Sequence, residues 1–251
     1  MLGPFSRTEL LLGEQALDVL ARAHVAVFGI GGVGGMAAEA LARSGIGAID
    51  LVDSDTVDTT NLNRQIVATV DVIGQPKVHV MAERIARINP QCTVTPRVCF
   101  YLPETADQFD FAAFDYVVDA VDTMTAKLQL VEAARTAGTP IVSSLGTGNK
   151  LDPTAFRVSD IYDTRVCPLA KIMRKECRKR GIDHLKVVYS EEEPLKPTAA
   201  AGDGQPASGS RRSTPGSVAF VPPAAGLALA SVVVRDLIEH ATATGEETLH
   251  D

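Results

Sequence analysis

A glycine-rich turn between two apolar runs constrains this chain more than any other feature. Gly29, Gly31 and Gly34 match the pattern G-x-G-x-x-G, and the apolar residues 25–28 lead directly into them. A second apolar run follows and ends at Asp53. In nucleotide-binding α/β proteins such glycines provide a tight turn, close approach of the backbone to a phosphate, and close packing of a helix on a strand. The pattern therefore predicts a strand, a phosphate-binding loop, a helix, and a second strand whose terminal acid contacts a ribose hydroxyl.

Basic side chains after Asp53 indicate more phosphate-binding charge than a dinucleotide needs. Arg64 lies in a polar cluster, and Lys77 opens an amphipathic helix expected at 77–88. One interpretation is a solvated loop and an ordinary surface helix. The other is that Arg64 binds phosphate oxygens with its planar guanidinium and Lys77 with a point charge. No hydride-transfer residues are evident, so an NAD-dependent dehydrogenase is a weaker alternative, and a non-catalytic nucleotide-binding domain also stays open.

Two acids follow the apolar residues 116–118, at the expected end of another strand. These are Asp119 and Asp122. Ligands of open parallel sheets bind at the carboxyl ends of the strands. One of the two acids is a candidate magnesium ligand, because magnesium takes few carboxylates and leaves the rest of its shell to water and phosphate. The alternative is an aspartate that caps the following helix.

The order of apolar runs and helical patterns predicts an α/β fold with a Rossmann-like, mostly parallel sheet flanked by helices. A helical segment is expected at 5–23, and Arg7 near its start opposes the helix dipole, so it is either solvated or neutralised by an anion. The later elements are expected in this order: strand 92–100, helix 125–137, strand 140–145, strands 154–162 and 185–189, and helix 224–241.

We expect a single domain over 1–251, with a nucleotide-binding half at 5–150. A smaller C-terminal lobe of strands and helices is expected at 151–241. The lobe includes residues 191–216, which are rich in Gly, Pro, Ala and Ser and are expected to form a mobile loop.

Charge is distributed unevenly along this acidic chain. The formal net charge of -7 excludes a broadly basic coat for nucleic acid. One predicted helix nevertheless forms a local positive face suited to a phosphate backbone, with an ordinary solvated face as the alternative. Its basic residues are Lys171, Arg174, Lys175, Arg178, Lys179 and Arg180.

Cysteine spacing and hydropathy argue for a cytoplasmic protein. The four cysteines contain no C-x-x-C pair, so a thiolate zinc site is not supported, and reduced thiols are expected. The N-terminus lacks the pattern of a secretory signal. The apolar stretch 218–234 approaches transmembrane length, but two adjacent prolines interrupt it and charges follow it, so a buried helix without stable membrane insertion is expected.

At GIGGVGG, Asp53, NLNRQ, Lys77 and DAVDT the chain resembles the ThiF/MoeB group of ubiquitin-activating-enzyme-like adenylating enzymes. The resemblance covers about residues 5–240. It implies an ATP site with Asp122 as the magnesium ligand, and a homodimer in which Arg7 reaches the neighbouring subunit's ATP site. Arg64, Lys77, Asp122 and Arg7 are then the catalytic residues. The ATP-binding residues implied are Gly29, Gly31, Gly32, Gly34, Asp53, Asp55, Asn61, Arg64, Gln65, Lys77 and Asp122.

Further segments, among them DPTAFRVSDIY and CPLAKIMRKECRKRGI, resemble a tRNA-modifying branch of this group. This resemblance implies ATP-dependent ring closure of N6-threonylcarbamoyladenosine in tRNA, with tRNA held by the basic helix. A monovalent cation and a cysteine desulfurase system are further candidates for cofactor and partner. The alternative activity is adenylylation of the C-terminus of a ubiquitin-like sulfur-carrier protein. Thr123 stands where many relatives have Asn, and Cys167 is interpreted as a packed thiol in preference to a thioester nucleophile.

Overall fold

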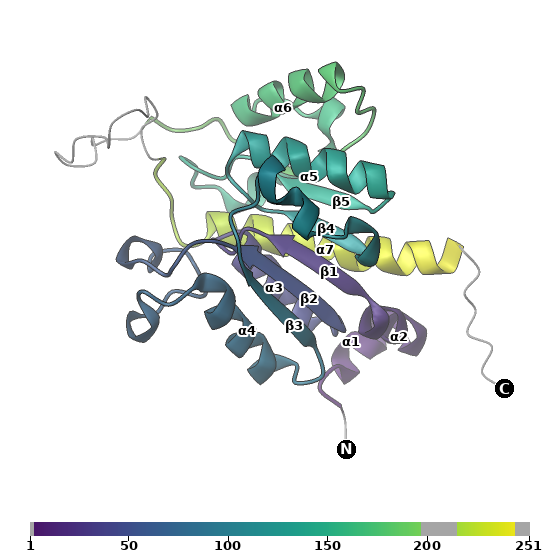
Figure 1. The fold of residues 1–251 in the computed structure, drawn as a ribbon. Helices are drawn as coiled ribbons and strands as arrows, with labels where there is room; N and C mark the ends of the chain where they lie inside the picture. Colours follow the sequence, from purple (N-terminus) through teal and green to yellow (C-terminus); the bar gives the residue numbers. More distant parts are fainter. Residues whose placement is uncertain (1–2, 197–214, 244–251) are drawn as a thin grey trace.

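Seven strands of the computed structural model, which describes residues 3–196 and 215–243, form one sheet in the order β3-β2-β1-β4-β5-β7-β6 (Figure 1). Every pair of neighbours is parallel except β6 and β7. The strands are β1 (His24–Phe28), β2 (Ala48–Asp53), β3 (Thr93–Val98), β4 (Tyr116–Asp119), β5 (Ile141–Ser144), β6 (Phe156–Asp160) and β7 (Lys186–Ser190).

Helices cover both faces of the sheet (Figure 1). They are α1 (Ser6–Leu12), α2 (Glu14–Arg22), α3 (Gly34–Arg43), α4 (Lys77–Ile88), α5 (Met124–Ala137), α6 (Pro168–Lys179) and α7 (Val221–Ala243). One hydrophobic cluster joins α3, α4 and α7 to the sheet, and α5 packs on the opposite face. In β1, Val25 and Val27 belong to the first cluster, whereas Ala26 and Phe28 belong to the second. Burial on both faces explains why the strand reads as an unbroken apolar run.

The predicted α/β class and the order of the first five strands are confirmed. The expected helical segment at 5–23 is divided at Gly13, whose φ of 86° lies in the region that favours glycine. Helix α7 begins a few residues earlier than expected, with two prolines in its first turn. A helix tolerates proline there because the first backbone N–H groups have no partner within the helix.

The C-terminal part shares the main sheet. Strand β7 pairs with β5, and β6 pairs with β7, so the two strands expected in a smaller lobe extend the same sheet. Helix α6 adds a separate hydrophobic cluster that includes Met173 and Cys177. Residues 191–196 and 215–216 of the expected mobile loop are described, and 197–214 lie outside the described residues.

Helix α7 is the one described helix that is long and apolar enough to cross a bilayer, and half of its most apolar window is buried in the protein. A side chain at Gly226 would overlap the carbonyl oxygen of Val33, which precedes α3, so α7 and α3 are in close contact there. Lys186 Nζ and the Tyr116 hydroxyl each lie 2.6 Å from Asp236 Oδ2 on this helix. The helix thus packs into the core, as the sequence predicted.

Candidate active site at the carboxyl edge of the sheet

The carboxyl ends of β1, β2 and β4 bring the glycine loop and the acids to one edge. Asp53, the last residue of β2, accepts a hydrogen bond from the Ile30 backbone at 2.6 Å and another from the Asp55 backbone at 2.8 Å. Asp53 therefore fixes the glycine loop and the segment that follows β2 relative to each other.

The three motif glycines meet different surroundings. Gly29 has a φ of 88°, and a Cβ there would lie 2.7 Å from the Ala120 carbonyl oxygen. A Cβ on Gly34 would overlap the carbonyl oxygen of Gly29, so a side chain would separate α3 from β1. At Gly31 the nearest atom to such a Cβ is Nε2 of Gln65, 3.9 Å away. The outer glycines are therefore required for the fold, and Gly31 leaves backbone open to a ligand.

The segment after β2 places a cation and a capped turn beside the loop. Lys77, the first residue of α4, is buried, and its Nζ lies 2.8 Å from Asp55 Oδ2. Asp58 and Asn61 form a reciprocal capping box around a short 3₁₀ turn. Hydrogen bonds from Thr60 lower the pKa of Asp58, which keeps this cap ionised.

Arg64 and Gln65 follow this turn. Nη1 of Arg64 donates to the Thr60 carbonyl at 2.9 Å and to Asn63 Oδ1 at 2.8 Å. Gln65 is buried, and its Oε1 has no hydrogen-bond partner among the described residues. A buried polar atom without a partner is uncommon in folded proteins, and Nε2 of the same amide is the nearest atom to the position that a Cβ on Gly31 would take. The amide oxygen is therefore suited to accept a hydrogen bond from a ligand.

A Cβ on Gly32 would lie 3.2 Å from the Arg64 carbonyl oxygen and 3.0 Å from Pro222 of α7. The loop is thus enclosed on these sides.

The structure separates the two acids after β4. Asp119 is fully buried, and both of its oxygens accept hydrogen bonds from Lys127 Nζ, at 3.0 and 3.1 Å. Nζ also donates to the Ser144 carbonyl at 2.6 Å. Asp122 remains exposed, and its Oδ1 accepts a hydrogen bond from the Thr123 hydroxyl at 3.3 Å. Asp122 is therefore the acid available to magnesium.

The donor set fits magnesium better than zinc. No group of three or more His, Cys, Asp or Glu side chains with metal-site geometry occurs in residues 3–196 and 215–243. One carboxylate beside a phosphate-binding loop matches the few protein ligands that magnesium takes.

Sequence reasoning missed Lys127 as a site-supporting residue. The available signal was a lysine between apolar residues of the helix expected at 125–137, at a position that the structure buries.

Arg7 is not brought to this edge in its own chain. It is exposed on α1, and a ring atom of the preceding Phe5 would lie 3.7 Å from a Cβ on Gly45, in the loop that leads into β2. Figure 1 shows α1 beside the start of β1, where the strands begin. Helix α1 therefore lies at the opposite end of the strands from the carboxyl edge.

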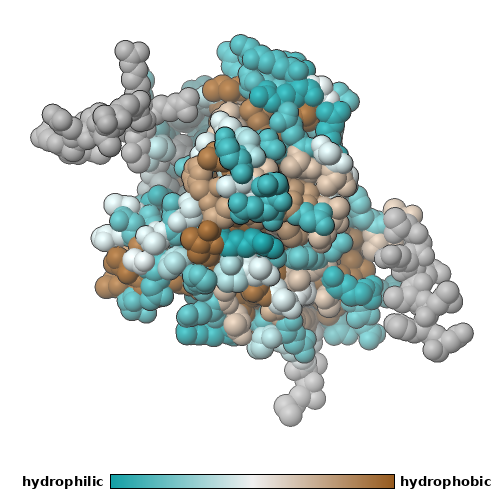
Figure 2. All heavy atoms as spheres, in the orientation of Figure 1, coloured by the Kyte–Doolittle hydropathy of each residue, from teal (hydrophilic) through white to brown (hydrophobic). Residues whose placement is uncertain are grey.

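The basic helix α6 begins near the candidate site, since a Cβ on Gly146, just beyond β5, would lie 3.8 Å from Leu169. Hydrophilic residues cover this helix in Figure 2. Lys171 and Lys175 are exposed and make no ion pair or hydrogen bond within the described chain. The other four basic side chains have partners in the protein: Arg174 binds the Thr164 carbonyl, Arg178 lies over the Tyr162 ring, and Lys179 and Arg180 pair with Glu176.

Cys167 precedes α6 and is 3% exposed, within the cluster that contains Met173. Its position agrees with a packed thiol.

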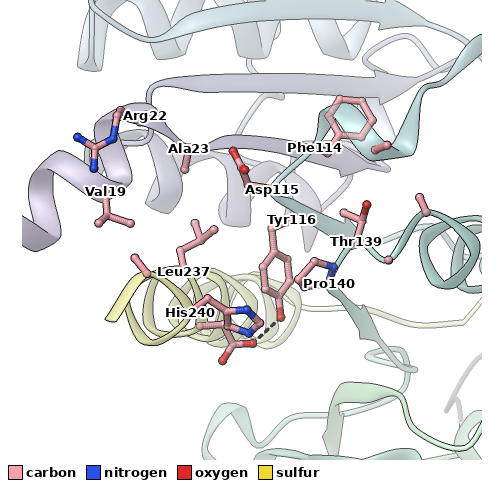
Figure 3. Close-up of a pocket in the computed structure, with 15 residues that line it drawn as sticks. Val19, Arg22, Ala23, Phe114, Asp115, Tyr116, Thr139, Pro140, Leu237 and His240 are labelled. Carbon is pink, nitrogen blue, oxygen red and sulfur yellow. Dashed lines mark hydrogen bonds between the residues drawn. The ribbon is translucent and has the colours of Figure 1, made fainter. Parts of the chain in front are cut away.

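A hollow of about 390 Å³ lies at the opposite edge of the sheet (Figure 3). It is lined by α2, the start of β4 and the end of α7, and it contains none of the predicted site residues. The Tyr116 hydroxyl donates a hydrogen bond to Asp236 there. Burial is the main cause that raises the pKa of Tyr116, and the Asp236 carboxylate raises it further, so the phenol stays neutral.

The chain is similar to known proteins over nearly its whole length. The sequence profile of the ThiF family matches residues 5–250. A tRNA threonylcarbamoyladenosine dehydratase of Bacillus subtilis strain 168 is 45% identical over 244 residues, which cover 95% of this chain and 96% of that protein.

Solved structures show the same similarity. The crystal structure of Escherichia coli tRNA N6-threonylcarbamoyladenosine dehydratase, TcdA, in complex with ATP has a TM-score of 0.86 and 36% identity, and the match covers 96% of each chain. The same protein in complex with AMP has a TM-score of 0.85 and 37% identity, with the same coverage. These similarities extend far beyond the glycine motif that a dehydrogenase would share.

The different surroundings of Gly31 and Gly34 predict different effects of a single methyl group. Gly31→Ala should keep the melting temperature of the parent and weaken nucleotide binding at least tenfold, because the methyl occupies space that a phosphate would approach. Gly34→Ala should lower the melting temperature, because α3 must move away from β1. Thermal unfolding and calorimetric titration with ATP measure both. Unchanged ATP affinity in Gly31→Ala would show that the phosphates do not bind at this loop.

Proposed function

The chain belongs to the ThiF family, as its motifs predicted, and we propose that it catalyses the ATP-dependent cyclisation of N6-threonylcarbamoyladenosine in tRNA. The observation that carries this proposal is the open backbone at Gly31, bordered by Gln65 and by the segment that ends at Lys77. That arrangement lies in a chain similar over nearly its whole length to dehydratases of this name.

The reaction begins with activation of the threonyl carboxylate, which is a poor acyl donor because it has no good leaving group. An oxygen of the threonyl carboxylate attacks the α-phosphorus of ATP, and pyrophosphate leaves. An internal nitrogen of the threonylcarbamoyl arm then attacks the acyl carbon, and AMP leaves with the former carboxylate oxygen. The nitrogen loses its proton, so the base loses one water in total and ATP becomes AMP and pyrophosphate.

The protein contributes position and charge to this reaction. Both bonds of Arg64 use Nη1, so its remaining donors can bind phosphate oxygens without loss of the contacts that hold it. Lys77 supplies a buried positive charge, and the open Gly31 backbone receives the phosphates. Magnesium, held by Asp122, would supply further neutralisation of the triphosphate. We propose the other site residues, Gly29, Gly32, Gly34, Asp53, Asp55, Asn61 and Gln65, as the remainder of the ATP site.

We propose a homodimer in which Arg7 of one copy completes the site of the other. Arg7 lies at the far edge of the sheet from its own glycine loop. On the same helix, Leu10 and Leu11 are 88% and 85% exposed, which is apolar surface that a second copy can cover.

We propose that α6 binds the tRNA backbone, chiefly through Lys171 and Lys175. These two lysines are free for phosphate, whereas Arg174, Arg178, Lys179 and Arg180 contribute to the positive potential while they hold partners in the protein.

We also propose that the chain is a single domain and that it is cytoplasmic. A single domain over 1–251 is supported by β6 and β7, which extend the main sheet beyond the nucleotide-binding half. A cytoplasmic location is supported by the free thiols of Cys92, Cys99, Cys167 and Cys177. A monovalent cation and a cysteine desulfurase system remain expectations from the resemblance alone.

The function is tested by mass spectrometry of tRNA nucleosides after incubation with protein, ATP and magnesium. The parent should convert threonylcarbamoyladenosine to a product lighter by one water. Arg64→Ala should lower the rate at least about a hundredfold, because the charge on the triphosphate is then poorly neutralised, while Arg87→Ala, an exposed arginine on α4, should match the parent. Chelation of magnesium should also abolish product. Near-normal turnover by a folded Arg64→Ala protein would overturn the assignment.

The shared site is tested by mixing two inactive variants. Arg7→Ala and Arg64→Ala proteins should each be inactive, yet their heterodimer holds one site with both arginines intact. After random exchange of subunits, about a quarter of the parent activity should return, since half of the dimers carry one complete site out of two. Native mass spectrometry verifies that subunits have exchanged. If the mixture is then no more active than its components, Arg7 does not contribute to the site of the other subunit.

The tRNA surface is tested by salt dependence. Lys171→Ala with Lys175→Ala should weaken tRNA binding and lower the slope of log Kd against log salt by about 1–2, because two phosphate contacts are lost. Arg22→Ala with Arg87→Ala removes the same charge from exposed sites elsewhere and serves as the control. An equal change of slope in both double variants would indicate net charge in place of a specific surface.

A further inference from the structure

Asn149 holds two parts of the chain that are distant in sequence. Its carbonyl accepts a hydrogen bond from the Leu195 backbone at 2.7 Å. Its own N–H donates to the Gly216 carbonyl at 2.8 Å, and its Oδ1 accepts from the Gly216 N–H at 2.6 Å. The chain therefore leaves at Leu195 and returns at Gly216 past the same residue.

The backbone at Asn149 is shaped for this double contact. Its φ of 59° is left-handed, a region where asparagine is far more common than most side chains. A Cβ on the preceding Gly148 would lie 2.7 Å from Pro215, so the returning chain passes against bare backbone. The two residues together fix where residues 215–217 lie.

The returning chain then reaches the candidate site. The Ser217 carbonyl accepts a hydrogen bond from Asn63 Nδ2 at 3.0 Å, and Asn63 Oδ1 accepts from Arg64 Nη1 at 2.8 Å. A few residues later, Pro222 lies against Gly32 of the glycine loop. Hydrogen bonds from Asn149 to Gly216, the covalent link from Gly216 to Ser217, and hydrogen bonds from Ser217 to Asn63 and from Asn63 to Arg64 thus connect Asn149 to the guanidinium of Arg64.

The Asn63 amide links the position of Ser217 to the hydrogen bond of Arg64. An amide that donates to the Ser217 carbonyl must present its oxygen on the other side, where Arg64 donates. Without the carbonyl at that position, the amide is free to turn, and its NH₂ group would then face a guanidinium that can only donate. The place of Ser217 therefore determines whether Arg64 keeps Asn63 as a second acceptor beside the Thr60 carbonyl.

We propose that Asn149 is a positioning residue for the nucleotide site. It acts on Arg64 through Gly216, Ser217 and Asn63. This inference rests on the proposed contact between Arg64 and the triphosphate. It assigns Asn149 a specific effect, since Arg64 would bind phosphate groups that ATP has and AMP lacks. The side chain of Asn149 therefore contributes to the preference for ATP over AMP.

The test measures the dissociation constants of ATP and of AMP by calorimetry in the parent and five variants. Asn149→Gly keeps the backbone bonds and accepts the left-handed conformation, but it removes Oδ1. Asn149→Asp keeps an oxygen acceptor for the Gly216 N–H. Glu192→Ala is the control, because Glu192 accepts from the Leu151 and Asp152 N–H groups of the same loop and has no bond to Gly216.

Asn149→Gly should weaken ATP binding about fivefold, in line with the loss of one hydrogen bond, and leave AMP binding unchanged. Asn149→Asp should restore the preference for ATP, and Glu192→Ala should not alter it, even if its melting temperature falls. Asn63→Ala should reproduce the effect of Asn149→Gly, and the double variant should be no worse than either single one, as expected for members of one series.

An unchanged ratio of the two constants in Asn149→Gly would overturn the inference, as would equal weakening of ATP and AMP or a parent protein without preference for ATP. If Asn149→Gly does not fold, Asn63→Ala alone decides, since it interrupts the same series from the other side. A parent that binds ATP with this preference but makes no cyclised nucleoside would refute the proposed function and leave the inference intact.

Discussion

The contact between Gly34 and the carbonyl of Gly29 is the constraint on which the rest of the site depends. A side chain at Gly34 would overlap that carbonyl, and one at Gly29 would press on Ala120 beyond β4. The first turn of α3 can therefore lie directly against the ends of β1 and β4, with its N–H groups and positive dipole end at the carboxyl edge. Asp53 then fixes the loop through the Ile30 N–H, so the open backbone at Gly31 is held in place by the fold itself.

Buried polar contacts extend this arrangement to the side chains. Asp119 and Lys127 form an ion pair that is almost completely buried, and Lys127 also binds the Ser144 carbonyl at the end of β5. Separating the two partners would leave unpaired buried charges, which is strongly unfavourable. The pair therefore holds β4, β5 and α5 together rigidly. Asp122 stands beyond this junction, exposed beside the loop. The same principle holds around Arg64, where contacts with Thr60 and Asn63 place the guanidinium before any ligand binds.

Much of the fold could be predicted because local sequence and packing agree. The apolar run before Gly29, the acid at Asp53 and the periodicity of 77–88 each mark an element that the structure contains. What could not be predicted depends on distant neighbours. Sequence spacing alone did not distinguish Asp119 from Asp122, because the difference is the partner Lys127. Likewise, β6 and β7 gave no sign that they extend the main sheet. The contacts of Arg174 with Thr164 and of Arg178 with Tyr162 also depend on residues outside α6. Nothing local to Asn149 indicates that Gly216 returns to it.

The central claim is that ATP activates the substrate carboxylate by transfer of its adenylyl group, and oxygen-18 tests that claim most directly. The substrate is tRNA in which both carboxylate oxygens of threonylcarbamoyladenosine are oxygen-18. After incubation with the protein, ATP and magnesium, mass spectrometry measures the label in AMP, pyrophosphate and the cyclised base. The account predicts one labelled oxygen in AMP, one retained in the cyclised base and none in pyrophosphate. Label in inorganic phosphate, or cyclised product with unlabelled AMP, would contradict adenylylation of the carboxylate at this site.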